Sequence, residues 1–236
     1  MPLSFWAIPA TFASCSILFQ VLCHRSGFQA ELSCSRVSLV HHVLATIFGL
    51  LVHYRYSESV KTDDAALYAP SSDFHGAVLL QHFNIGYFLY DTVHVAVWDQ
   101  RWMVHHLVAI AGYTSSEVAN VYALANAVNT WITEIGSLMY STYLIRRTEA
   151  SYVAFCVMYT ASRIYFAVWS LKVLRGAWNA VQGRSQFDFP AWAPYCTFLL
   201  QVSLLSVNVA FAATHCRKLW RRYVRGGDGA KARKED

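Results

Sequence analysis

Apolar runs of about 20 residues recur along the chain from Phe5 to Thr214, and no polar linker long enough to separate two domains lies between them. A helix needs about 20 mostly apolar residues to cross the hydrocarbon core of a bilayer. Of the 236 residues, 56% are hydrophobic and only 14% are charged, which leaves little sequence for a soluble catalytic domain. The pattern predicts an all-α polytopic membrane protein with a single membrane domain.

The limits of the apolar runs predict seven membrane spans, with six as the alternative. The spans cover roughly residues 5–23, 37–55, 76–98, 103–118, 121–144, 151–174 and 191–214. The fourth span is short and ends in the polar stretch Thr114 to Glu117. We therefore expect the fourth and fifth spans to form a tight helical hairpin.

Lysine and arginine residues predict the orientation of these spans. With seven spans, one side of the membrane receives 13 of them, eight in the segment 216–236, and the other side receives 5. The positive-inside rule then places the C-terminal tail in the cytosol, although without the tail the two sides tie. We interpret the tail as a contact with the anionic cytosolic leaflet and expect no nucleic-acid partner, because no folded basic surface accompanies it.

Polar residues fall on one face of five spans when each span is projected at about 100° per residue. These faces comprise Ser38, His42, Thr46, Gly49 and His53; Asn84, Tyr87, Asp91 and His94; Asn126, Asn129, Thr133, Ser137 and Tyr140, with Glu134 at the edge; Tyr152, Cys156, Tyr159, Arg163 and Ser170; and Thr197, Gln201 and Asn208. An unpaired ionised group at the bilayer centre costs at least about 2.5–3.5 kcal/mol. The matching faces therefore predict a shared polar interior. Ordinary interhelical hydrogen bonding is the alternative, but it does not require ionisable groups on four spans.

Two adjacent histidines, His105 and His106, begin the fourth span. Neighbouring helical residues diverge by about 100°, so one ring can face the interior while the other contacts a neighbouring helix. An intramembrane histidine can transfer a proton or act as a nucleophile near neutral pH, helped by a carboxylate that orients the ring. Asp91, Asp99 and Glu134 are the candidate orienting groups. The HxxHH and HxxxH spacings of membrane di-iron enzymes are missing, and we expect no metal.

Four stretches in order resemble the TLC-domain family, which contains ceramide synthases, translocon-associated membrane proteins and smaller lipid-homeostasis proteins. They are SRVSLVHHVLATIFGL (35–50, with His42), IGYFLYDTVHVAVWDQRWMVHHLVAI (with Asp91, Asp99, His105 and His106), NTWITEIGSL (with Thr133 and Glu134) and ASRIYF (with Arg163). The resemblance implies six helices ringed around a lipid-accepting cavity over residues 35–215. The first helix and its loop (1–34) lie outside this ring, and the basic cytosolic tail (216–236) follows it.

In ceramide synthases the histidine pair is held to take part in acyl transfer from acyl-CoA, and His105 and His106 inherit that role by resemblance. The chain lacks the long His-Asp and Ser-Asp motif that follows the pair in those enzymes and has Asn129, Thr133 and Glu134 there instead. The pattern is closer to the small TLC-domain-containing proteins than to full ceramide synthases. The final RKED resembles a dibasic retrieval signal, which favours the endoplasmic reticulum.

The resulting hypothesis is a membrane protein of lipid metabolism and homeostasis that binds an acyl lipid in an intramembrane cavity. Its sharpest version is ceramide-synthase-like acyl transfer, which needs acyl-CoA as co-substrate and no cofactor. The catalytic candidates are His105, His106, Asp91 and Glu134, and the substrate-binding candidates are His42, Asn84, Tyr87, His94, Asn129, Thr133 and Arg163. The expected partners are membrane lipids, and the sequence leaves a homo-oligomer open. The alternatives are a non-enzymatic lipid sensor, lipid transporter or cargo-escort protein, and a structural subunit whose polar faces serve packing only.

Overall fold

The computed structural model describes residues 3–27, 29–58, 67–98, 103–184 and 188–223. Its long helices are α1 (Ala7–Arg25), α2 (Ala30–Arg55), α4 (His75–Trp98), α5 (Met103–Ala119), α6 (Ala123–Arg146), α7 (Glu149–Val181) and α8 (Ala193–Tyr223). Two short 3₁₀ helices, η1 (Leu3–Trp6) and η3 (Ser71–Asp73), precede α1 and α4. No strand occurs in these ranges, and the predicted all-α polytopic fold is confirmed.

The seven helices match the seven predicted spans in order, but α2, α7 and α8 are longer than predicted. α2 begins at Ala30, seven residues before the predicted span. α7 continues to Val181 and α8 to Tyr223, so that the first residues of the expected tail are helical. The remaining tail residues, 224–236, lie outside the described ranges and include the RKED signal. α8 is thus a span that extends into its own basic terminus.

By length and composition alone, four of the described helices could cross a membrane: α1, α2, α7 and α8. α5 has only 17 residues, while α4 and α6 carry histidine, asparagine, glutamine and carboxylate side chains that lower their hydropathy. Many of these polar residues are buried, including Gln81, Asn84, Asn129 and Glu134. Buried polar residues therefore explain why α4 and α6 have a lower hydropathy than α1, α2, α7 and α8.

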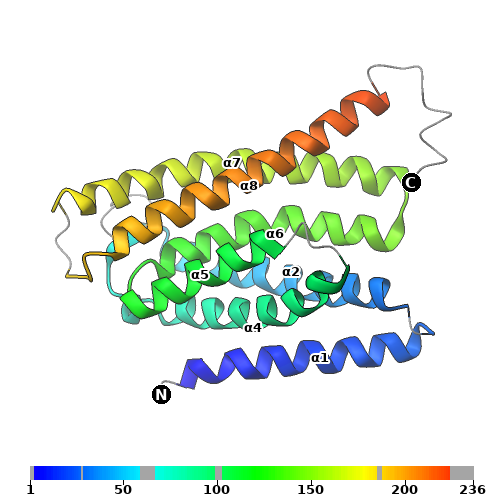
Figure 1. The fold of residues 1–236 in the computed structure, drawn as a ribbon, viewed down its shortest axis with the longest axis horizontal. Coiled ribbons are helices and arrows are strands. Elements are labelled where there is room, and N and C mark those ends of the chain that lie inside the picture. Colours follow the sequence, from blue (N-terminus) through cyan, green and yellow to red (C-terminus); the bar gives the residue numbers. More distant parts are fainter. Residues whose placement is uncertain (1–2, 28, 59–66, 99–102, 185–187, 224–236) are drawn as a thin grey trace.

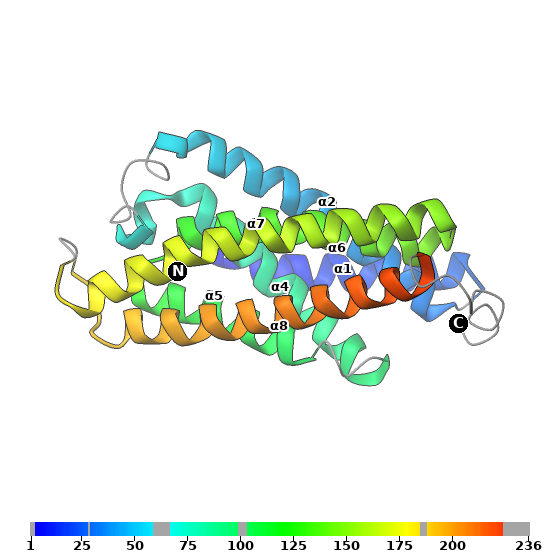
Figure 2. The same ribbon diagram turned by 90° about the horizontal axis from the view of Figure 1, so that it is seen from above.

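Six helices close into a ring in which each contacts the next in the order α2, α6, α7, α8, α5 and α4. α4 and α6 also touch across the ring. α1 lies outside it, packed on α4 and α2 (Figures 1 and 2). α5 and α6 follow each other in sequence yet make few direct contacts, because the ring neighbours of α5 are α4 and α8.

Consecutive helices run in opposite directions along the bundle (Figure 1). The α1–α2 and α6–α7 connections therefore lie at the same end as the last turn of α8, and we refer to this end as the tail end. Large apolar side chains such as Leu51, Val104, Ile164 and Leu199 are exposed on the outside of the ring. An apolar exterior around a polar interior is the arrangement that a bilayer favours.

The predicted turn between α5 and α6 is tight, but the two helices make few direct contacts and do not pack on each other as a tight hairpin. Only Asn120, Val121 and Tyr122 separate the two helices, and Asn120 and Tyr122 adopt left-handed backbone angles with φ of 53° and 70°. The Ser116 hydroxyl donates to the Val121 carbonyl, and the Ser71 amide donates to the Asn120 carbonyl at 2.7 Å. Left-handed backbone angles are unfavourable for residues other than glycine, and these hydrogen bonds stabilise the connection despite that cost.

Candidate functional site

One face of α4 carries Gln81, Asn84, Tyr87 and Asp91 at successive helical turns, and each contacts a polar or aromatic group of another helix. Because α2, α5 and α6 run alongside α4, this face organises a column of polar contacts through the bundle. The column begins near the tail end at Asp91 and ends near the opposite end at Gln81. All four residues are buried.

Nearest the tail end, the Asp91 carboxylate lies between α2 and α5. Its Oδ2 atom is 3.4 Å from Nε2 of His106, and its Oδ1 atom accepts a hydrogen bond from the Cys34 thiol at 3.7 Å. The Phe88 ring, 5.3 Å from the His106 ring, covers the pair from α4. Of the predicted orienting carboxylates, Asp91 is thus the one beside His106, an arrangement in which a carboxylate can fix the tautomer of a general base. Asp99 lies outside the described ranges.

His105 points in a different direction from His106, with the two ring centroids 5.8 Å apart. It is half-buried. On α5, positions 108, 109, 112, 115 and 116 follow His105 on the same helical face. His105 therefore belongs to the interior face of α5, whereas His106 contacts α4.

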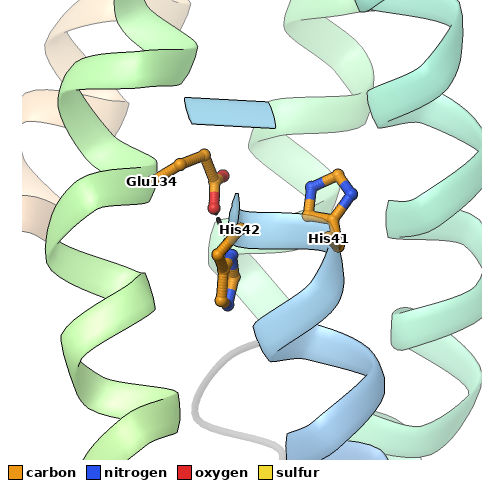
Figure 3. Close-up of side chains that lie close together, drawn as sticks. All are labelled: His41, His42 and Glu134. Atoms are coloured by element: carbon orange, nitrogen blue, oxygen red, sulfur yellow. Dashed lines mark hydrogen bonds and ion pairs between the residues drawn. The ribbon is translucent and has the colours of Figure 1, made fainter. Parts of the chain in front are cut away.

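A second carboxylate–histidine contact joins α2 to α6. Nδ1 of His42 forms a hydrogen bond with Oε2 of Glu134 (Figure 3). The neighbouring His41 stacks on Tyr87 of α4 with ring centroids 3.5 Å apart and an interplanar angle of 6°. Both ring nitrogens of His41 are buried and have no hydrogen-bond partner among the described residues. Glu134 thus orients His42 of the other histidine pair rather than His105 or His106.

Arg163 reaches inward from α7 and is only 4% exposed. Its Nη1 atom donates to the Thr133 carbonyl at 2.8 Å, and its Nη2 atom lies 3.5 Å from the Ser137 hydroxyl. The guanidinium also stands over the Tyr159 ring, 4.2 Å from its centroid. No described carboxylate lies within ion-pair distance of it, and its Nε atom has no hydrogen-bond partner in the described ranges.

A cavity of about 60 Å³ occupies the space between α5, α6, α7 and α8. Its polar lining comes from Tyr113, Ser115, Ser116, Asn126, Asn129, Thr197 and Gln201. The Asn129 amide donates to Gln201 at 3.2 Å, and Gln201 donates to Ser170 at 2.8 Å, while Oδ1 of Asn129 has no described partner. On α5 the cavity begins at Val108, one helical turn from His105.

The structure uses some predicted substrate-binding residues for contacts between helices. Asn84 donates to Tyr113 at 3.2 Å and to Thr130 at 2.9 Å, and Tyr87 is covered by His41. Thr133 contributes its backbone carbonyl to Arg163. Asn129 lines the cavity. The side chain of His94 lies outside the described part of the structure.

A further cluster, which the sequence analysis did not select, closes the column at the end opposite the tail. Glu117 of α5 lies 3.1 Å from Nε2 of His82 and accepts a hydrogen bond from Gln81 at 3.1 Å. Gln81 in turn accepts a hydrogen bond from Asn126 of α6 at 3.0 Å. The sequence contains a pattern that predicts this cluster, because Gln81 lies one helical turn before Asn84 on the same face as Tyr87 and Asp91.

Comparison with known proteins agrees with this architecture. The TLC domain model of the TRAM, LAG1 and CLN8 proteins matches residues 31–217, which runs from α2 into the last part of α8 and omits α1. The chain therefore belongs to the TLC-domain family and is a membrane protein of lipid metabolism. No curated protein and no solved structure shows significant similarity to it.

Proposed function

We propose that the protein binds an acyl lipid between α5, α6 and α8, with the polar or anionic end of the lipid near Arg163 and His105. The observation that carries this proposal is the buried Arg163 cation, which forms no ion pair with a described carboxylate. It bonds to the Thr133 carbonyl, one helical turn along α6 from Asn129, which lines an interior cavity with hydrogen-bonding groups. An isolated charge within a membrane domain is expensive, and such residues commonly mark a ligand path. A lipid phosphate or carboxylate would supply the missing negative charge.

The cavity is much smaller than the roughly 300–1,000 Å³ of typical small-molecule sites, so binding requires α5 to move away from α6. Direct contacts between α5 and α6 are sparse, so the movement would act mainly on the packing of α5 against α4 and α8. Gly112 lies at this boundary, lines the cavity and has nothing within 4 Å of an added Cβ atom. A larger side chain introduced at Gly112 would therefore fill the space proposed for the lipid without pushing a helix away.

Acyl transfer is the second candidate function, and the pairing of Asp91 with His106 favours it. In this version His106 or His105 acts as general base or transient acyl acceptor, Asp91 orients His106, and acyl-CoA is the donor. His106 does not line the cavity as the structure stands. The same opening of α5 that admits a lipid would also expose the histidine pair.

The binding proposal is tested by lipid mass spectrometry on protein purified in a mild detergent. The unsubstituted protein should retain a defined lipid, and Gly112→Leu should reduce its amount at least about fivefold with no loss of thermal stability. Gly76→Ala serves as the matched control, because the nearest neighbour of an added Cβ there is at an ordinary contact distance of 3.4 Å. Equal lipid retention by Gly112→Leu would contradict the proposed cavity. If no lipid is retained at all, the polar interior serves packing only.

The enzymatic version is tested with labelled acyl-CoA and a panel of sphingoid amine and lysolipid acceptors. The unsubstituted protein should form acylated product, and a double His105→Ala, His106→Ala variant should lose at least about 100-fold in turnover. Lipid retained by a protein that forms no product with any acceptor would favour the sensor, transporter or cargo-escort alternatives. Turnover that survives the double substitution would exclude the histidine pair.

We also propose an endoplasmic reticulum location with the tail end of the bundle in the cytosol. The basic residues Arg217, Lys218, Arg221 and Arg222 at the end of α8 support this orientation. Modification of Cys216, which is exposed on the same helix, by a membrane-impermeant thiol reagent tests it in sealed microsomes. Cys216 should react from the cytosolic side, and reaction only after the membrane is opened would reverse the orientation.

A further inference from the structure

His41, His42 and Glu134 form a cluster between α2 and α6 (Figure 3). One ligand atom from each of them, a ring nitrogen or a carboxylate oxygen, lies within 4.8 Å of the other two. We propose that these three residues bind a divalent metal ion, with zinc as the ion that matches them best. This site is independent of the acyl-lipid proposal.

The ligand types carry the first part of the argument. Two imidazoles and one carboxylate form a set that zinc uses in enzymes, where a fourth position stays open. Around a tetrahedral zinc ion, ligand atoms about 2.0–2.2 Å from the metal lie about 3.3–3.6 Å apart. The more distant ligand atoms therefore need to approach one another by no more than about 1.5 Å, while the hydrogen-bonded atoms of His42 and Glu134 must move apart to admit the ion.

His41 carries the second part. Its ring is 2% exposed, and neither ring nitrogen has a hydrogen-bond partner among the described residues. A buried polar group left without a partner costs about 1–3 kcal/mol. The His41 ring stacks on Tyr87 and Phe83, with centroid distances of 3.5 Å and 5.0 Å, and this stacking fixes the plane of the ring. The two ring nitrogens remain available to bind a ligand. A metal ion would give one of these nitrogens a partner.

The contact between His42 and Glu134 carries the third part. A hydrogen bond joins Nδ1 of His42 to Oε2 of Glu134, and a metal ion that binds both atoms takes the place of the hydrogen between them. The charge of Arg163 also reaches Glu134, so two positive charges would favour an anion, such as hydroxide, at the open position.

The expectation from sequence that no metal is present rested on the spacing of histidines along one helix. The structure offers a set that joins two helices, with the third ligand 92 residues from His42. Spacing motifs within one helix cannot detect such a set. The two histidines are adjacent in sequence, and their divergent directions are bridged by the carboxylate from α6.

The test uses the full chain in detergent, stripped of metal with a chelator and then titrated with Zn²⁺ or Co²⁺. We expect about one ion per chain by elemental analysis, and Co²⁺ absorption bands of a four-coordinate site. His41→Phe retains the stacking on Tyr87 but cannot bind a metal, and it should weaken binding at least about 100-fold, beyond the loss typical of outer-shell changes. Glu134→Gln should do the same, because the amide carries no negative charge.

His105→Asn and His106→Asn are the matched controls and should leave metal binding unchanged. Added zinc should also raise the Tm of the stripped unsubstituted protein in a concentration-dependent way, which does not depend on any variant folding. The proposal is overturned if folded, stripped protein binds neither ion, or if His41→Phe binds zinc as the unsubstituted protein does. Retained lipid in a metal-free His41→Phe protein would leave the acyl-lipid proposal intact.

Discussion

Arg163 on α7 donates to the backbone carbonyl of Thr133 on α6 at 2.8 Å, and this bond joins a buried cation to a neutral acceptor. The other contacts of the guanidinium are the hydroxyls of Ser162 and Ser137 and the face of Tyr159. Neutral acceptors orient a charge but do not neutralise it. Glu134 is near enough for its charge to interact with that of Arg163, but the two form no ion pair, so the guanidinium can still bind an anion.

Replacement of this cation gives the first prediction. Arg163→Met keeps the length of the side chain and removes the buried charge, so we expect an unchanged or higher Tm, because apolar substitution of buried charges is often neutral or stabilising. The same variant should retain at least about fivefold less anionic lipid by mass spectrometry. Arg147→Gln is the control, because Arg147 forms an exposed ion pair with Glu31 at 3.5 Å.

Two results would contradict this interpretation of Arg163. Unchanged lipid retention by Arg163→Met would show that the cation does not bind the lipid. A large loss of stability with no lipid in the unsubstituted protein would show that Arg163 serves only to join α6 and α7.

The sequence predicted the positions of the helices well, because recurring apolar runs mark them. A helix is present at each of the seven predicted positions, and the stripe on α4 was visible at helical spacing. The prediction failed at the start of α2 and at the far ends of α7 and α8, where the helix continues past the apolar run. Nothing in apolar length marks where such an extension stops.

The partners of the polar residues could not be predicted, because they depend on how the helices are ordered around the ring. Glu134 lies beside His42 because α6 packs on α2, and Asp91 lies beside His106 because α4 packs on α5. From the sequence alone, either carboxylate could serve either histidine pair. Pairing is a property of the helix arrangement, whereas the choice of residues on each face is local.

The bond network across the cavity gives a second prediction. Gln201→Leu leaves the amide of Asn129 and the hydroxyl of Ser170 without their shared partner, and we expect a lower Tm in detergent. Interhelical hydrogen bonds in membranes average about 0.6 kcal/mol and reach about 1.7 kcal/mol, so the two together should cost about 1–3 kcal/mol. Ser203→Ala on the outer face of α8 removes only a local bond to Leu199 and should have almost no effect. Equal melting of all three proteins would show that water satisfies these groups.

The packing of α1 gives a third prediction. A Cβ atom on Gly86 of α4 would lie 2.5 Å from the Ile8 carbonyl and 2.8 Å from Cβ of Thr11, so Gly86→Ala should push α1 away from the ring. We expect a loss of about 1–3 kcal/mol from overpacking. Cys15 on α1 should then react faster with a thiol reagent, as followed by peptide mass spectrometry. The control Gly76→Ala should gain stability from helix propensity. An unchanged Cys15 rate in Gly86→Ala would mean that α1 does not rest on this glycine.

The two carboxylate–histidine pairs can be separated by their effects on acyl transfer. Asp91→Asn preserves the shape of the side chain beside His106 but removes the charge that would stabilise an imidazolium, so kcat should fall at least about tenfold with little change in bound lipid. Glu134→Gln acts on His42 and should leave kcat within about threefold if Asp91 alone serves the reaction. Single-turnover kinetics with labelled acyl-CoA measure both. A large loss in Glu134→Gln and none in Asp91→Asn would transfer the catalytic role to His42. The reaction would then occur at the cluster for which we propose a metal, since His42 and Glu134 supply two of its three ligands.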